Sequence, residues 1–368
     1  MKTDILFEPV ELGNLSLTNR IVMAPMTRNF SPGNVPNDEV AGYYRRRAEG
    51  GTGLIITEGT GVNHPVSVNT DGIPVFYGED ALAGWKRVVD EVHDAGGKIM
   101  PQLWHQGIER KPGTGPNAEM PSVSPSGLVS PGKKVGEALT TQEVEGLVKA
   151  FADAAEDAKT IGFDGIELHG AHGYLLDEFF WDGTNVRDDR YGGDIVKRTK
   201  FVCEMVQEIR RRVGKDFPIV LRFSQWKQRD YEARLAETPE LLAEFLNPLS
   251  EAGVDIFHCS TRRYWEPEFE GSDLNLAGWT KRLTGKPTIT VGSVGLADDF
   301  FGSMVGQASQ STGAEGLQNL IERFEREEFD LVGVGRALLI DPAWANKVRD
   351  QKFDDLLPFT KEALTALS

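Results

Sequence analysis

His169, His172 and Tyr174 follow a short apolar run near the middle of the chain and are interleaved with glycines. The glycines allow the backbone to bend sharply and leave space for a close approach. Titratable side chains just beyond the end of a buried strand are typical of an active site on an α/β barrel. From these residues alone two alternatives stay open. Each histidine could be an ordinary core or surface residue, or the pair could bind a metal with Asp177 or Glu178 as a third ligand.

The overall composition narrows the class of protein and of its partners. Hydrophobic residues make up 40% of the 368-residue chain and charged residues 26%, as in ordinary globular proteins. A net charge of −16 argues against nucleic acid and anionic membranes as partners, although backbone N–H groups and a few arginines can still bind an anionic cofactor. The two cysteines form no CxxC pair, which argues against a cysteine-ligated zinc or iron–sulfur site. No apolar stretch resembles a signal peptide or approaches the ~20 residues that span a bilayer, so we expect a cytoplasmic protein.

Short apolar runs alternate with amphipathic segments along the chain. Eight runs predict buried strands: Ile21–Met26, Gly53–Ile56, Ile99–Leu103, Gly165–Leu168, Ile219–Phe223, Ile256–Cys259, Thr288–Val291 and Leu331–Val334. Helical periodicity lies between them, at Ala81–Asp94, Gln142–Ile161, Ile195–Val213, Pro239–Ala252 and Gly316–Glu327. Strand–helix alternation of this kind predicts an α/β fold, a (β/α)8 TIM barrel that forms a single domain over residues 1–368. The alternative, an open doubly wound sheet, is disfavoured because no GxGxxG sequence follows the first strand.

Two segments are too long for simple connections. Residues 110–135, rich in Pro, Gly and Ser, follow the third predicted strand, and residues 261–277, with several aromatic residues, follow the sixth. Long loops in compact domains are often functional lids. Because both segments follow strands at their C-terminal ends, we predict that they cap a pocket on that face of the barrel rather than serve as plain surface loops.

The residues at the ends of the predicted strands define a candidate site. They include Pro25, Met26, Thr27, Glu58, Gly59, Gln102, Trp104, His169, His172, Tyr174, Arg222, Gly292, Ser293, Gly335 and Arg336. Arg222 inside a barrel would be an unpaired buried charge unless an anionic or electron-rich group meets it. The glycine-rich turns after the last two strands are either ordinary tight turns or, with Arg336, a phosphate site. With no lysine and no carboxylate pair at the strand ends, the site suits a planar cofactor better than Schiff-base chemistry or glycoside hydrolysis.

Sequence motifs spread over nearly the whole chain point to one family. They are Leu6–Pro9, Leu17–Arg28, Gly53–Glu58, Gln102–His105, Glu167–Leu176, Arg187–Gly193 and Gly335–Arg336. In this combination the chain resembles the Old Yellow Enzyme family of flavin mononucleotide (FMN) oxidoreductases. The resemblance implies FMN as cofactor, NAD(P)H as reductant and a small activated alkene as substrate, with no metal, nucleic acid or membrane involved. It leaves monomer and homodimer both open.

The resemblance also implies a role for each site residue. Those expected to contact FMN are Pro25, Met26, Thr27, Gly59, Gln102, His169 and Arg222 at the ring, and Gly292, Ser293, Gly335 and Arg336 at the phosphate. His169 and His172 would bind the carbonyl or nitro oxygen of the substrate, where two imidazole donors stabilise negative charge. Tyr174 would protonate the α-carbon as a general acid after hydride reaches the β-carbon. Trp104 and Trp265 would line the substrate pocket.

Some segments depart from the family pattern and keep other functions open. They are Thr27, where one branch carries a cysteine, Gln225–Ala236, the run from His258 to Trp265, and Phe300–Glu315. Arg262 and Arg263 either favour an acidic substrate or pair with nearby glutamates. The alternatives to an ene-reductase are an FMN-dependent oxidative demethylase or dehydrogenase of an amine or betaine, a metal-dependent barrel hydrolase, and a barrel that only binds a ligand.

Overall fold

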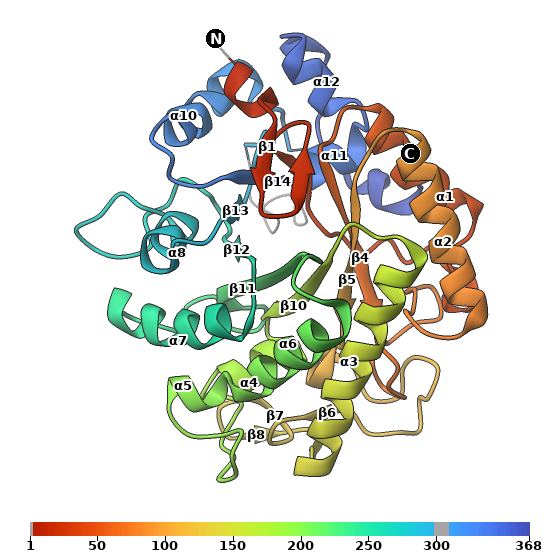
Figure 1. The fold of residues 1–368 in the computed structure, drawn as a ribbon, viewed down its shortest axis with the longest axis vertical. Helices are drawn as coiled ribbons and strands as arrows, with labels where there is room; N and C mark the ends of the chain where they lie inside the picture. Colours follow the sequence, from red (N-terminus) through yellow and green to blue (C-terminus); the bar gives the residue numbers. More distant parts are fainter. Residues whose placement is uncertain (1–2, 298–308) are drawn as a thin grey trace.

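Eight parallel strands close into a barrel at the centre of the molecule (Figure 1). The computed structural model describes residues 3–297 and 309–368, so the first part of Phe300–Glu315 lies outside the described residues. In chain order the barrel strands are β3 (Ile21–Met23), β4 (Leu54–Gly61), β5 (Ile99–Trp104), β10 (Ile166–His172), β11 (Ile219–Lys227), β12 (Ile256–Ser260), β13 (Thr288–Val291) and β14 (Leu331–Val334). All eight predicted strands are present, and the predicted TIM barrel is confirmed.

Helices surround the barrel and cover the outward faces of its strands. The predicted helical segments appear as α2 (Glu79–Asp94), α3 (Thr141–Ile161), α5 (Ile195–Arg198) with α6 (Lys200–Val213), α7 (Pro239–Ala252) and α10 (Gly313–Glu325). Helices that were not predicted are α1 (Asp38–Glu49), α4 (Leu175–Phe180), α8 (Leu276–Thr284), α11 (Arg336–Ile340) and α12 (Trp344–Arg349). Three of these have six residues or fewer, too few for a periodic pattern.

Short elements complete the part of the chain that the structure describes. The 3-10 helices are η1 (Asp4–Phe7), η2 (Pro32–Asn34), η3 (Gly107–Glu109), η4 (Phe353–Asp355) and η5 (Lys361–Thr365). None of the described helices combines the length and apolarity needed to cross a membrane.

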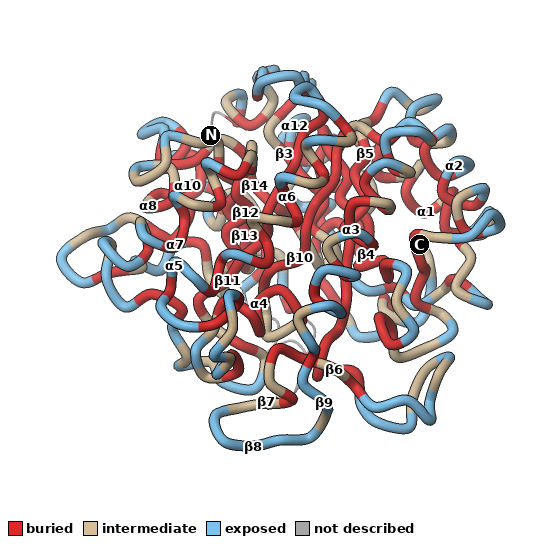
Figure 2. The backbone as a smooth tube through the Cα atoms, turned by 60° about the horizontal axis from the view of Figure 1, so that its bottom comes forward, coloured by how far each residue is buried: buried red, intermediate tan, exposed pale blue. Residues whose placement is uncertain are grey.

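Side chains along the barrel strands alternate between the interior and the surrounding helices. Leu168, Leu221 and Phe257 face outward and join the large core between strands and helices. A separate apolar cluster comprises Val22, Leu54, Ile56, Met100, Val220, Ile256, Ile289 and Leu331, together with Val10, Leu12, Leu15 and Leu17. The last four come from the hairpin β1 (Val10–Leu12) and β2 (Leu15–Leu17), which closes the N-terminal end of the barrel. Figure 2 shows the barrel strands as buried over most of their length.

The segment 110–135 is partly ordered by two small sheets. It holds β6 (Val123–Ser124), β7 (Leu128–Ser130) and β8 (Lys133–Lys134), and β9 (Glu137–Ala138) follows it. β6 pairs with β9 and β7 with β8. These strands lie at the rim of the molecule, where β8 and β9 are exposed and β6 and β7 are partly or fully buried (Figure 2).

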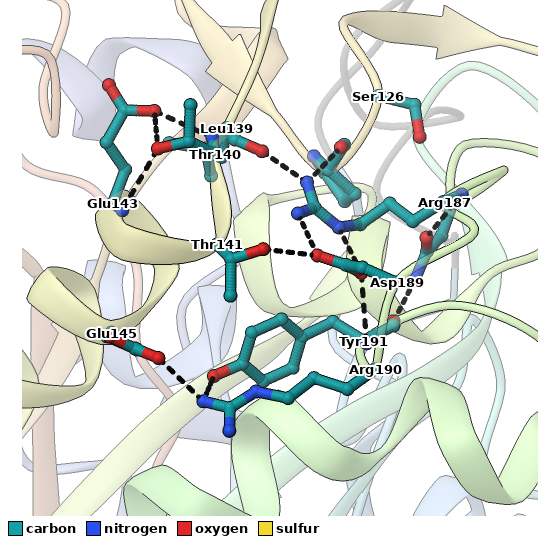
Figure 3. Close-up of polar contacts among 12 residues, drawn as sticks. Ser126, Leu139, Thr140, Thr141, Glu143, Glu145, Arg187, Asp189, Arg190 and Tyr191 are labelled. Atoms are coloured by element: carbon teal, nitrogen blue, oxygen red, sulfur yellow. Dashed lines mark hydrogen bonds and ion pairs between the residues drawn. The ribbon is translucent and has the colours of Figure 1, made fainter.

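Arg187 and Asp189 fasten this loop to the start of α3 (Figure 3). The Arg187 guanidinium donates to the carbonyl oxygens of Pro125, at 2.7 Å, and of Leu139. It also pairs with Asp189, which accepts further bonds from the Thr141 hydroxyl at 2.8 Å and the Tyr191 N–H at 3.1 Å. These hydrogen bonds, chiefly that from Arg187, hold the pKa of Asp189 well below its usual range. The Arg187–Gly193 motif therefore has a structural role here.

Candidate active site

A cavity of about 740 Å³ opens at the C-terminal ends of the barrel strands. All eight strands, or the turns that follow them, contribute to its wall. The wall includes the predicted residues Pro25, Met26, Thr27, Gly59, Gln102, Trp104, His169, His172, Tyr174, Arg222, Gly292, Ser293, Gly335 and Arg336. Side chains that lie more than 300 residues apart in the sequence thus form one site.

His169, His172 and Tyr174 lie together on one wall of this cavity. The ring centroids of the two histidines are 5.3 Å apart, and the Tyr174 ring is 4.9 Å from that of His169. His172 and Gly173 adopt left-handed backbone conformations, with φ of 68° and 83°. This turn brings Tyr174 back beside His169, and Trp104 stacks on His169 at 5.9 Å while packing edge-on against Tyr174 at 4.8 Å. The predicted cluster is therefore present as a compact group.

The protonation states of these three residues follow from their burial. Loss of solvent, aided by the nearby Arg222 charge, lowers the pKa of both His169 and His172 well below its ordinary value. The Nδ1 atom of His169 accepts a bond from the Ala171 N–H at 3.4 Å, which leaves the proton of the neutral ring on Nε2. Burial raises the pKa of Tyr174, so its phenol stays protonated at neutral pH.

A buried ion pair fixes the turn after β10. Lys227 Nζ lies 2.7 Å from Asp177 Oδ1, and the other carboxylate oxygen accepts the Gly173 N–H at 2.6 Å. Glu178 accepts the Ile108 N–H at 2.7 Å. Both carboxylates proposed as a third metal ligand are thus bonded elsewhere. Within residues 3–297 and 309–368, no group of three His, Cys, Asp or Glu side chains is placed to hold a metal.

Arg222 is a buried cation with incomplete hydrogen bonding. It is 8% exposed, and its Nη2 atom donates to Ser260 Oγ at 3.3 Å. Its Nε atom has no hydrogen-bond partner among the described residues. An electron-rich group in the cavity would supply the missing acceptor, as the sequence predicted.

A buried polar network crosses the barrel interior near Arg222. Gln102 Nε2 donates to Glu167 Oε1 at 2.8 Å, and His258 Nδ1 lies 2.6 Å from Glu167 Oε2. These contacts hold the Gln102 amide at the cavity wall, because its partner is itself held from the opposite side. Glu167, inside β10, is a neighbour of the site that strand-end residues alone did not reveal.

The turns after β13 and β14 have the chemistry of a phosphate site. Gly292 and Ser293 have φ of 143° and 54°, and the Ser293 hydroxyl donates to the Arg262 carbonyl at 3.0 Å. A Cβ atom added to Gly335 would meet only Met26 Sδ, at 3.6 Å, so the cavity side of this turn is open. Backbone N–H groups in such turns, with the Arg336 guanidinium beside them, suit a phosphate.

Glu58 supports the segment that carries Thr27. Its Oε2 atom accepts the backbone N–H groups of Arg28 at 2.8 Å and Asn29 at 3.0 Å. Burial raises its pKa to about 7. The next residue, Gly59, must lack a side chain, because an added Cβ atom would lie 2.5 Å from the Trp104 ring. Glu58 therefore shapes the site without lining the cavity.

Trp265 and one predicted loop lie away from the cavity. Trp265 is 36% exposed, and its ring packs edge-on against Tyr264 at 5.1 Å. Residues 110–135 contribute nothing to the cavity wall, whereas residues 261–277 contribute Thr261 and Arg262. Arg263 pairs with Glu266 at 2.9 Å, as the solvated alternative expected. The anchoring of residues 110–135 by Arg187 explains why this loop stays at the rim of the molecule.

Several residues of the wall were not predicted. Among them are Trp226, Gln228 and Tyr231. Trp226 stacks on His172, with ring centroids 4.6 Å apart, and its indole N–H donates to the Ser260 carbonyl at 3.2 Å. β11 continues four residues past the predicted end at Phe223, and that extension places Trp226 over the site. An aromatic residue just after the polar end of the predicted strand was the sequence signal that could have revealed the place of Trp226.

Comparison with known proteins places this geometry in a family. A sequence profile of the NADH:flavin oxidoreductase / NADH oxidase family matches residues 5–355. NADH oxidase from Thermoanaerobacter brockii is 35% identical over 95% of this chain and 52% of its own length. 12-oxophytodienoate reductase 2 from Arabidopsis thaliana is 32% identical over 79% of this chain and 83% of its own length. The chain spans about half the length of the first of these relatives.

Solved structures give the same result. Morphinone reductase in complex with tetrahydroNAD superimposes with a TM-score of 0.79 and 27% identity, covering 98% of this chain and 93% of that one. The Old Yellow Enzyme homologue from Zymomonas mobilis has a TM-score of 0.80 and 25% identity, covering 98% of this chain and 96% of that one. The chain therefore belongs to the NADH:flavin oxidoreductase / NADH oxidase family, the Old Yellow Enzyme family of FMN-dependent oxidoreductases.

Proposed function

We propose that this chain is an NAD(P)H-dependent ene-reductase that acts on small activated alkenes such as enones, enals and nitroalkenes. One observation carries the proposal: two neutral imidazoles and a protonated phenol share one wall of a cavity that also contains the under-bonded Arg222. Two hydrogen-bond donors next to one proton donor match the needs of a conjugated carbonyl or nitro group that is being reduced.

The cavity has the residues to hold FMN. Of the residues that line it, Pro25, Met26, Thr27, Gly59, Gln102 and Arg222 would contact the ring, and Gly292, Ser293, Gly335 and Arg336 would bind the phosphate. When bound, FMN supplies two-electron chemistry, accepting hydride from NAD(P)H and giving hydride to the β-carbon of the alkene. The unpaired Nε of Arg222 would gain an acceptor if the electron-rich edge of the ring lay against it.

His169 and His172 would bind the substrate oxygen and stabilise the negative charge that develops there. A neutral imidazole can serve this purpose because it still carries one N–H donor. The lowered pKa of both histidines keeps the rings neutral, so each offers a hydrogen bond from its single N–H and has no imidazolium proton to transfer. Removing one such donor typically costs ~10²–10³ in rate.

Tyr174 would deliver the proton to the α-carbon. Its raised pKa keeps the phenol protonated over the neutral range, as a general acid requires. Its ring lies beside that of His169, with centroids 4.9 Å apart, so the acid would lie next to the oxygen-binding group. The same alkene could then be held at its oxygen and protonated at its carbon.

The names of the relatives favour the reductive direction. They include reductases of 12-oxophytodienoate, morphinone and cinnamate. This supports alkene reduction over the oxidative demethylation of an amine or betaine. Membership of an oxidoreductase family also displaces the hydrolase alternative.

Replacing Tyr174 by Phe tests the proposal because it removes only the acid. We expect reduction of the bound flavin by NADPH to keep its rate, while its reoxidation by cyclohexenone slows about 10²-fold or more, in line with the usual contribution of a general acid. Stopped-flow absorbance measures both steps separately. Tyr191→Phe is the matched control, since the Tyr191 hydroxyl bonds Glu204 at 2.8 Å and lies outside the cavity wall. Unchanged reoxidation in Tyr174→Phe would contradict the assignment.

A further inference from the structure

Ser260 occupies a position between the two functional halves of the cavity. It is the last residue of β12 and is 2% exposed. Its Oγ atom lies 2.7 Å from His172 Nε2 and accepts the Arg222 Nη2 bond at 3.3 Å. A single hydroxyl thus connects the cation expected at the flavin with an imidazole expected at the substrate.

The direction of these bonds follows from what each group can donate. Arginine has N–H donors and no acceptor, so the Ser260 oxygen must accept from Arg222. The hydroxyl keeps one hydrogen to donate, and His172 Nε2 is the acceptor within hydrogen-bond distance among the described residues. The Arg222 charge polarises the hydroxyl and strengthens this donation. His172 Nε2 is therefore an acceptor, and the proton of the neutral ring lies on Nδ1.

The two histidines consequently present different nitrogens as donors. His169 accepts a backbone N–H at Nδ1 and carries its proton on Nε2, whereas His172 accepts from Ser260 at Nε2 and carries its proton on Nδ1. If His172 were instead protonated on Nε2, its Nδ1 lone pair would be the atom left for a substrate oxygen, and two acceptors repel. The Ser260 hydroxyl decides between these two states.

We propose that Ser260 is a positioning residue that fixes the Nδ1–H tautomer of His172 and thereby makes His172 a hydrogen-bond donor to the substrate oxygen. The catalytic consequence rests on the proposed function, but the tautomer does not. The backbone of Ser260 has a separate task, because its carbonyl accepts the Trp226 indole N–H at 3.2 Å and holds that ring against His172. Ser260→Ala removes the hydroxyl and leaves this backbone contact in place.

The tautomer can be read directly by NMR. The chain has six histidines, so selective ¹⁵N-histidine labelling gives a small set of ring signals, and the set lost in His172→Asn identifies His172. In long-range ¹H–¹⁵N spectra of the flavin-loaded protein, we expect His172 to carry its proton on Nδ1. In Ser260→Ala we expect a second population with the proton on Nε2. Ser260→Thr, which keeps the hydroxyl, should restore the single Nδ1–H form.

Kinetic measurements on the same variants show whether the tautomer matters. We expect Ser260→Ala to slow flavin reoxidation by cyclohexenone about 10- to 100-fold, less than the ~10²–10³ for losing a donor outright, because part of the population stays correct. Trp226→Phe keeps the stacked ring and loses the indole bond, so the His172 tautomer should not change. Ser16→Ala, at the exposed position of strand β2, is the matched serine control.

Two results would overturn the inference: a proton on Nε2 of His172 in the unaltered protein, or an unchanged tautomer in Ser260→Ala. A different result would overturn only the proposed function. In that case the spectra show the expected tautomers, but no activated alkene reoxidises the flavin of the unaltered protein. Thermal unfolding verifies that the Ser260→Ala protein is folded. If Ser260→Thr fails to fold, the His172 tautomer in Ser260→Ala is compared with that in Ser16→Ala instead.

Discussion

At the N-terminal ends of the barrel strands the interior is filled by apolar side chains, whereas towards their C-terminal ends it holds Arg222, Glu167, Gln102 and His258. The lower, apolar layer takes side chains from every barrel strand except β10, the upper, polar layer takes these four from β5, β10, β11 and β12, and both layers are almost fully buried. The lower layer is sealed by the β1–β2 hairpin, and the upper layer faces the cavity. The alternation of side chains along each strand allows the interior to change character within two residues.

This difference separates the part of the chain that makes the fold stable from the part that makes it reactive. Apolar burial stabilises the barrel directly, while a buried charge stabilises it only when its partners are complete. Arg222 lacks a partner for Nε in the upper layer, which costs free energy in the protein alone. We infer that this cost is tolerated because bound cofactor supplies the partner.

The largest expected effect on stability comes from the lower layer. Leu331 is fully buried in the apolar cluster, so Leu331→Ala should reduce the free energy of unfolding by about 2–5 kcal/mol. Chemical denaturation measures this change. Each folded, flavin-loaded molecule should still turn over at its normal rate, because Leu331 does not line the cavity. A large loss of rate in the folded variant would show that the two layers are not independent.

Arg222→Met, in the upper layer, should have the opposite effect: it should weaken cofactor binding without lowering stability. We expect FMN affinity to fall about 10- to 100-fold, the equivalent of one charged hydrogen bond of ~1.5–3 kcal/mol. The flavin-free protein should be no less stable, because the change removes an under-bonded buried charge. Fluorescence titration with FMN and thermal unfolding without it measure the two effects.

Arg47 offers a matched control for that variant. It is also fully buried, but its guanidinium donates to the carbonyls of Tyr43 at 3.0 Å and Leu339 at 2.8 Å. Arg47→Met should therefore destabilise the flavin-free protein and leave those carbonyls unpaired. If Arg222→Met and Arg47→Met destabilised it equally, Arg222 would be a structural residue and the contrast between the layers would fail.

A smaller effect concerns Glu58, whose pKa is raised by burial to about 7. Because the unfolded chain has a lower value, the folded protein binds more protons between about pH 4.5 and pH 7, and its stability falls as pH rises through that range. This contribution amounts to roughly 2 kcal/mol between pH 5 and pH 7. In Glu58→Gln the fall should largely disappear. The test is to measure the free energy of unfolding across this pH range for both proteins. If it changed with pH equally in the unaltered protein and in Glu58→Gln, Glu58 would not be neutral in the folded state.

The fold, and those site residues that lie at the ends of recognisable strands, could be predicted from the sequence. Apolar runs such as Ile219–Phe223 mark barrel strands because both of their faces are buried, and the residue at each strand end then falls on a known face of the barrel. For this reason His169, Arg222 and Arg336 were correctly expected to line one cavity.

The rest depends on contacts between segments that sequence patterns do not connect. Ser260 and His172 are in contact although 88 positions separate them in the sequence, and nothing around either residue predicts the other as its partner. The short helices and the small sheets of residues 110–138 have too few residues for a periodic signal. Trp265 was expected in the pocket because it follows a barrel strand, but the chain turns away after Arg262, and Asn275 holds the new course by donating to the Tyr264 carbonyl at 2.7 Å.

The visible spectrum of the purified protein under anaerobic conditions tests the central claim most directly. We expect a flavin spectrum that bleaches on addition of NADPH and returns when cyclohexenone is added. That result would show both half-reactions in one cuvette. A flavin that bleaches but is not reoxidised by any enone, enal or nitroalkene would contradict the proposed reduction of activated alkenes and leave only the family assignment standing.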